Sequence, residues 1–105
     1  MLQFTGRQKR HLRSLGHHLK PLVFLGKAGL DGSQYEAILQ ALLDHELIKV
    51  KLGKACPLDV KETLALIEEN THATCIQKVG RMMLFYAPHP DDPQIEIPKP
   101  GKKQG

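Results

Sequence analysis

The residue types best suited to binding an anion stand together in one short stretch, Gly26-Lys27-Ala28-Gly29. This stretch follows the apolar run at residues 22–25 and precedes a segment with helical periodicity. We therefore expect a turn from a strand into a helix, where glycines let the backbone approach a ligand and helix N–H groups attract negative charge. With the mobile charge of Lys27, this loop is predicted to hold a phosphate of a nucleic-acid backbone. Glycine-rich turns also occur for steric reasons alone, so the motif by itself leaves both interpretations open.

Positive charge is concentrated in the first third of the chain, which has 105 residues and a formal net charge of +4. Residues 1–30 contain six Lys and Arg and no acid, whereas residues 31–105 contain nine Lys and Arg against eleven Asp and Glu. Such an asymmetry is typical of a surface that binds a polyanion. The alternative is a solvated charged face without a partner.

An amphipathic helix is predicted for residues 6–15, where Thr5 and Gln8 form a capping-box signature. One side of this helix would pack on a sheet through Gln8, Leu12, Leu15 and Leu19. The other side is basic and carries Lys9, Arg10, Arg13 and His17. If the helix packs beside the glycine loop, its basic side would join Lys20 and Lys27 in one continuous surface for RNA phosphates.

The rest of the chain predicts four strands and two more helices. The first expected strand is fully buried and covers residues 22–25, and a helix capped by Ser33 and Glu36 follows and ends near residue 45. The next strand, at 47–52, is half-exposed with Lys49 and Lys51 outward. A helix then runs from the Asp59 cap to about residue 70, and two strands at 73–79 and 82–86 are joined by a Gly80-Arg81 turn. The order α-β-α-β-α-β-β predicts an α/β (α+β two-layer) fold. Its four-stranded mixed sheet would have a parallel first pair and an antiparallel terminal hairpin.

One domain is expected at residues 1–87, followed by a tail at 88–105. Five of the seven prolines lie between Pro88 and Pro100, and two lysines stand near the end. This composition predicts loose packing.

Other chemistry has little support in the residue pattern. Six histidines and two cysteines lack the paired spacing of a zinc site, and the acidic pairs Glu68-Glu69 and Asp91-Asp92 are not placed in any cleft. Motifs for nucleotide hydrolysis or nucleophilic catalysis are missing. No apolar run reaches the roughly 18 residues of a membrane span, and no signal pattern begins the chain. We expect a cytoplasmic protein that is not an enzyme, with no metal, cofactor, membrane or small-molecule substrate.

Aromatic side chains are few, and most fall at expected core positions: Phe4, Phe24, Tyr35, Phe85 and Tyr86. An aromatic platform for stacking RNA bases, as in RRM domains, is therefore not expected.

Four segments together resemble the CRM (chloroplast RNA splicing and ribosome maturation) domain family. They are Gln8-Lys9-Arg10-His11-Leu12, His18-Leu19-Lys20-Pro21, Leu25-Gly26-Lys27-Ala28-Gly29-Leu30 and His45-Glu46-Leu47-Ile48-Lys49-Val50-Lys51. The similarity spans about residues 5–87 and includes the Gly80-Arg81 turn. As a single domain, the chain is similar to the stand-alone bacterial YhbY proteins of this family.

The resemblance implies a fold like the C-terminal domain of translation initiation factor three. It also implies RNA binding, with precursors of the large ribosomal subunit as the expected partner. RNA contacts would map to Gly26, Lys27, Ala28 and Gly29, to Lys20, and to the basic residues of the first helix.

A protein-interaction module is the alternative function. The basic helix could dock on an acidic protein, because the charge asymmetry does not distinguish such a partner from RNA.

Overall fold

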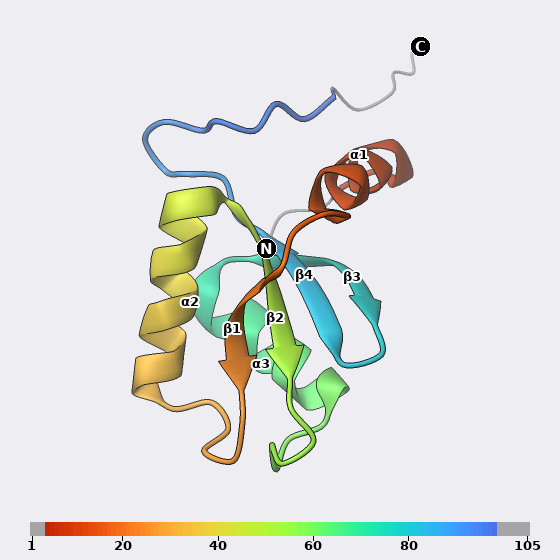
Figure 1. The fold of residues 1–105 in the computed structure, drawn as a ribbon. Coiled ribbons are helices and arrows are strands. Elements are labelled where there is room, and N and C mark those ends of the chain that lie inside the picture. Colours follow the sequence, from red (N-terminus) through yellow and green to blue (C-terminus); the bar gives the residue numbers. More distant parts are fainter. Residues whose placement is uncertain (1–3, 99–105) are drawn as a thin grey trace.

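The computed structural model describes residues 4–98 and shows three helices around one sheet in that part of the chain. The elements are α1 (Gly6–Gly16), β1 (Pro21–Leu25), α2 (Gly32–His45), β2 (Leu47–Leu52), α3 (Val60–Thr71), β3 (Thr74–Val79) and β4 (Met82–Tyr86), arranged as in Figure 1. This order confirms the predicted one. Within the described range, no helix is long and apolar enough to cross a membrane.

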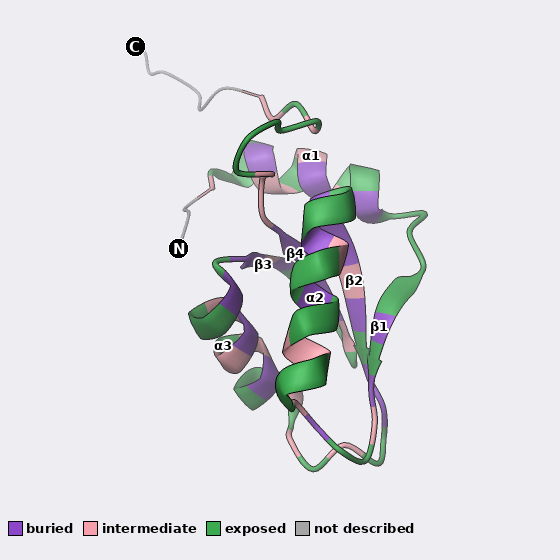
Figure 2. Cartoon of the chain, turned by 90° about the vertical axis from the view of Figure 1, so that its left-hand side faces the viewer, coloured by how far each residue is buried: buried purple, intermediate pink, exposed green. Residues whose placement is uncertain are grey.

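The four strands form one mixed sheet in the spatial order β1-β2-β4-β3. β1 pairs with β2 in parallel, while β4 is antiparallel to both β2 and β3. The predicted parallel first pair and antiparallel hairpin are thus confirmed. α2 and α3 cover one side of the sheet, as Figure 2 shows from the edge.

Local capping signals start two of the helices where they were predicted. The Thr5 hydroxyl accepts a hydrogen bond from the Gln8 amide at 3.1 Å, and the Gln8 side chain accepts one from the Thr5 amide at 2.9 Å. Asp59 and Glu62 form the same reciprocal pair at α3, at 2.7 and 3.2 Å. These pairs satisfy helix N–H groups that have no partner within the helix.

The start of α2 differs from the prediction, which placed the cap at Ser33 with Glu36. The cap is Asp31, whose carboxylate accepts the Gln34 amide at 3.0 Å and the Ser33 hydroxyl at 2.7 Å. A carboxylate is well suited to the positive end of the helix, so Ser33 becomes a residue of the first turn.

The two faces of the sheet are covered unequally. The main core lies beneath α2 and α3 and is formed by Val23, Leu25, Ile38, Leu42, Ile48, Val50, Leu52, Ile67, Ala73, Met83 and Phe85. The opposite face carries a smaller cluster at the α1 end, formed by Leu12, Leu47, Ile76, Leu84 and Tyr86. Below α1, this second face is left without a helix (Figures 1 and 2).

β1 lies at the edge of the sheet, which corrects the prediction of a fully buried strand. Val23 and Leu25 are buried, but Leu22 and Phe24 are 54% and 60% exposed. The alternation follows from covering only one face of the strand. It also removes Phe24 from the expected core aromatics, whereas Phe85 and Tyr86 are buried as expected.

α1 approaches the sheet most closely at Gly16. A Cβ atom added there would lie 2.8 Å from both methyl carbons of the buried Leu84. Leu12 is buried as predicted, but Leu15 and Leu19 are exposed instead of completing the core stripe. Close packing at the glycine therefore replaces part of the expected leucine contact.

The Pro-rich segment after β4 has neither helix nor strand over residues 88–98, yet it is held by one side chain. The carboxylate of Glu46 is 3% exposed and accepts amide hydrogen bonds at 2.7, 2.9 and 2.8 Å from His89, Gln94 and Ile95. These bonds tie the described part of the segment to the end of α2. Residues 99–105 of the predicted tail, with its lysines, lie outside the described residues.

Contacts with α1 hold the same segment from the other side. The Gln8 side chain donates to the Pro98 carbonyl at 3.0 Å, and Ile95 and Ile97 pack on the cluster beneath α1. The tail segment therefore links α1 to the end of α2.

We expect Glu46→Gln to destabilise the fold by about 2 kcal/mol at pH 7, because a buried carboxylate that accepts several hydrogen bonds loses its charge and one acceptor atom. Burial opposes ionisation of Glu46, but the three amide donors and the nearby His89 outweigh it and lower the pKa. The folded state thus binds the proton less readily than the unfolded state. The stabilisation is present above the ordinary glutamate pKa and is lost as pH falls through the lowered value.

Denaturant unfolding of both proteins from pH 7 to pH 3 measures this difference, with the exposed Glu69→Gln as the control. A difference in stability between wild type and Glu46→Gln that stays constant down to the lowest pH would contradict the role given to the carboxylate.

Two glycine substitutions should act in opposite directions. Gly32→Ala, at the start of α2, has no atom within 4 Å of the new Cβ and should stabilise the fold by up to about 1 kcal/mol. Gly16→Ala should destabilise it despite the same gain in helix propensity, because the new methyl group would overlap the buried Leu84. Thermal unfolding gives the sign of each change. Stabilisation by Gly16→Ala would show that α1 moves away from the sheet at little cost.

Candidate nucleic-acid interface

The Gly26–Gly29 loop is a tight turn that links β1 to α2. The Gly29 amide donates to the Gly26 carbonyl at 3.0 Å, and Gly29 has a φ of +70°, which favours glycine. Lys27 and Ala28 are exposed between them. Because the Gly29 N–H is used inside the turn, this loop offers a ligand the Lys27 charge rather than a full ring of free amides.

The N-terminus of α2 is already occupied by a negative charge. Hydrogen bonds from the Ser33 hydroxyl and the Gln34 amide lower the pKa of Asp31, so its carboxylate is ionised at neutral pH. An anion at this cap competes with a phosphate for the same N–H groups and repels it. The helix dipole therefore adds less to phosphate binding than the sequence motif implied.

A second loop runs beside the glycine loop, at the carboxyl ends of the two parallel strands (Figure 1). The Gly53 amide donates to the Leu25 carbonyl at 2.8 Å, and a Cβ added to Gly29 would lie 3.5 Å from Pro57. Lys54 is exposed on this second loop. The pairing of the two loops therefore adds a second cation at the end of the sheet that carries Lys27.

The basic side of α1 does not pack beside the glycine loop. α1 lies at the opposite end of the sheet in both views (Figures 1 and 2). There, Arg13 lines a shallow hollow with His17, His18 and Gln77, among others. The condition for one compact surface is therefore not met, and the predicted residues fall into two groups. One group holds Gly26, Lys27, Ala28 and Gly29, and the other, on or close to α1, holds Lys9, Arg10, Arg13 and Lys20.

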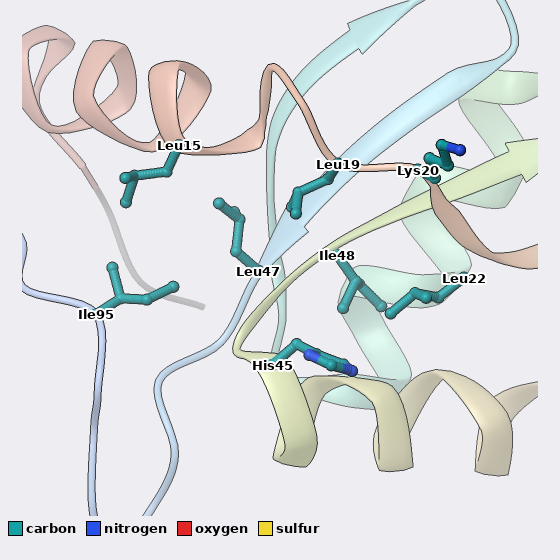
Figure 3. A pocket seen from close by; sticks show the side chains of 8 residues that line it. All are labelled: Leu15, Leu19, Lys20, Leu22, His45, Leu47, Ile48 and Ile95. Carbon is teal, nitrogen blue, oxygen red and sulfur yellow. The ribbon is translucent and has the colours of Figure 1, made fainter.

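Lys20 belongs to the α1 end and stands at the margin of an apolar pocket of about 330 Å³. Figure 3 shows this pocket between α1, β2 and the tail segment. Its apolar lining consists of Leu15, Leu19, Leu22, Leu47, Ile48 and Ile95. The exposure of Leu15 and Leu19 is thus explained by an open pocket rather than by contact with the core.

Two lysines of β2 bridge the separated groups. Lys49 and Lys51 alternate with buried apolar residues and lie on the face that α2 and α3 leave open. The Lys49 ammonium group is 3.5 Å from the carbonyl oxygen of His17, next to α1. Lys51 lies two residues further along β2, nearer the loops. The sequence predicted a half-exposed strand with these two lysines outward, and the burial pattern confirms it.

A hollow of about 440 Å³ lies below Lys51 at the end of the sheet. The β3–β4 turn reaches it, because the Leu52 amide donates to the Arg81 carbonyl at 2.8 Å and the Arg81 guanidinium donates to the Gly53 carbonyl at 3.4 Å. Among the described residues that line this hollow, three are cations and none is acidic: Phe24, Lys51, Leu52, Gly53, Lys54, Val79, Arg81 and Met82. Phe24, Lys54 and Arg81 were not predicted as site residues, because only the sheet pairing brings them together.

The Cys75 thiol is unsuited to nucleophilic catalysis. Burial, helped by the Glu68 carboxylate, raises the pKa of Cys75 to about 11. A reactive cysteine needs the opposite shift, because the thiolate is the nucleophile. Cys75 is therefore not a candidate nucleophile of this site.

Comparison with known proteins gives one consistent family. The chain is 34% identical over 94 residues to the "Probable RNA-binding protein YqeI" of Bacillus subtilis, covering 90% of this chain and 98% of that protein. It is also 34% identical over 99 residues to an "RNA-binding protein" of Haemophilus influenzae, covering 94% and 99%.

A solved structure has the same fold. The solution structure of SAV1595 from Staphylococcus aureus matches 91% of this chain and all of its own, with a TM-score of 0.75 and 34% identity. The family model of the CRS1 / YhbY (CRM) domain matches residues 4–87. The chain therefore belongs to the CRS1 / YhbY (CRM) domain family.

Proposed function

We propose that this protein binds RNA along the open face of its sheet. The observation that carries the proposal is the placement of Lys49 and Lys51, which connects the basic side of α1 with the lysines of the two loops. A row of cations can follow a phosphate backbone, and such contacts give affinity and position rather than sequence readout. The names of the bacterial relatives support the same partner.

The two groups of predicted site residues take different parts in this proposal. Lys27 at the tip of the Gly26–Gly29 turn would hold one end of the RNA, and Arg13 with Lys9, Arg10 and Lys20 would hold the other. The intervening lysines of β2 would contact the backbone between them. RNA longer than a single phosphate site would then bind more tightly than a short fragment.

The expected RNA is ribosomal RNA of the large subunit, in a precursor particle during ribosome assembly. The resemblance to the stand-alone YhbY proteins supports this choice, and we expect the protein to act in the cytoplasm. The role is that of a binding protein without catalytic activity.

Charge reversal at the centre of the face tests RNA binding directly. Lys51→Glu and Lys27→Glu should each weaken binding to ribosomal RNA fragments and reduce the slope of log K against log salt by about one. Lys61→Glu is the matched control, since it changes the same charge on the exposed start of α3, on the other side of the sheet.

Fluorescence anisotropy over a range of salt concentrations gives these slopes. An RNA affinity that does not change with salt concentration, or that falls equally in all three variants, would argue against a phosphate-binding face.

The identity of the partner is expected to appear in cells. Ultraviolet crosslinking followed by sequencing of the attached RNA should return large-subunit ribosomal RNA. A parallel affinity purification treated with ribonuclease separates RNA from an acidic protein partner. Protein partners that survive this treatment, without enrichment of ribosomal RNA, would favour docking of the basic helix on a protein.

A further inference from the structure

We propose that Phe24 is a stacking platform for one unpaired nucleobase of the bound RNA. This inference rests on the proposed function and adds to it a preference for single-stranded RNA at one end of the sheet. It reverses the expectation that this fold has no aromatic side chain available for bases.

Phe24 is exposed in a fixed position rather than on a mobile segment. It lies within β1, and the residue is 60% exposed. The edge of the ring lies against Gly53, where an added Cβ would be 2.6 Å from the Phe24 Cζ atom. The glycine thus lets the ring lie against the backbone of the neighbouring loop, which limits its motion.

The sheet register extends this ring into an apolar strip. Phe24 is paired with Lys51, Lys51 with Met82, and Met82 with Val79, so the four residues form one row across the strands. Paired residues point to the same face, and Val79 is 63% exposed. The strip is therefore exposed at both ends and is not part of the core.

Three cations accompany this strip. Lys51 belongs to the row itself, and Lys54 and Arg81 line the same 440 Å³ hollow. A flat apolar ring with cations at its margin matches a nucleotide, whose base can stack while its phosphates are neutralised. An apolar protein segment would bring no negative charge to these three cations. The hollow also has the volume typical of small-ligand sites.

An unpaired base fits this site better than a base pair. Bases in an RNA duplex have both faces covered by their neighbours, and proteins stack on bases of single-stranded loops and ends. Phe24 should therefore contribute to binding only where the RNA is unpaired.

The test uses a short single-stranded RNA that carries one 2-aminopurine, whose fluorescence falls when the base stacks, and the same strand annealed to its complement. Wild type should quench the single-stranded probe. Phe24→Leu should abolish the quenching and weaken single-strand binding about tenfold, which is within the range for loss of one aromatic stack. Phe24→Tyr should retain both. Binding of the duplex should be the same in all three proteins.

Leu39→Ala is the matched control for loss of an exposed apolar side chain, because Leu39 lies on α2 and is 40% exposed. It should leave both measurements unchanged. If Phe24→Leu binds and quenches like wild type while Lys51→Glu loses affinity, the stacking site is wrong and the proposed function stands. If wild type binds neither probe nor ribosomal RNA fragments, both proposals are wrong.

Discussion

The parallel pairing of β1 with β2 is the constraint on which the candidate interface depends. It places the carboxyl ends of both strands at one end of the sheet, so that the turn carrying Lys27 and the loop carrying Lys54 lie side by side. The same register sets Phe24 beside Lys51. An antiparallel first pair would send the glycine turn to the α1 end and leave these side chains apart. The chemistry of the surface therefore follows from strand direction as much as from residue type.

Local signals in the sequence were enough to predict most of the secondary structure. The reciprocal caps at Thr5 and Asp59 act within three residues of each helix start, and the alternation around Lys49 and Lys51 is visible without any partner strand. The predicted cap of α2 was wrong because two polar residues, Asp31 and Ser33, stand two positions apart and could each serve, and the carboxylate of Asp31 is the one used. The choice depends on a difference in charge that the spacing rule does not contain.

Features that depend on how the helices and strands are arranged in space could not be predicted from such local signals. Four consecutive apolar residues in β1 predict burial, but helices cover only one face of this strand, so every second residue is exposed. The location of α1 relative to the glycine loop is likewise a matter of topology. The ties made by Glu46 join residues more than forty positions apart, so composition alone described the segment after β4 as loose.

The contact between Phe24 and Gly53 also constrains how this surface can vary among related chains. A large ring at position 24 crowds any side chain at position 53, and the Leu25 carbonyl oxygen, 3.1 Å from an added Cβ, crowds it independently. The effects of substitutions at the two sites are thus non-additive. Shortening the side chain at 24 relieves only part of the crowding at 53. A chain that keeps glycine at 53 because of the Leu25 carbonyl therefore also keeps the room that an aromatic residue at 24 needs.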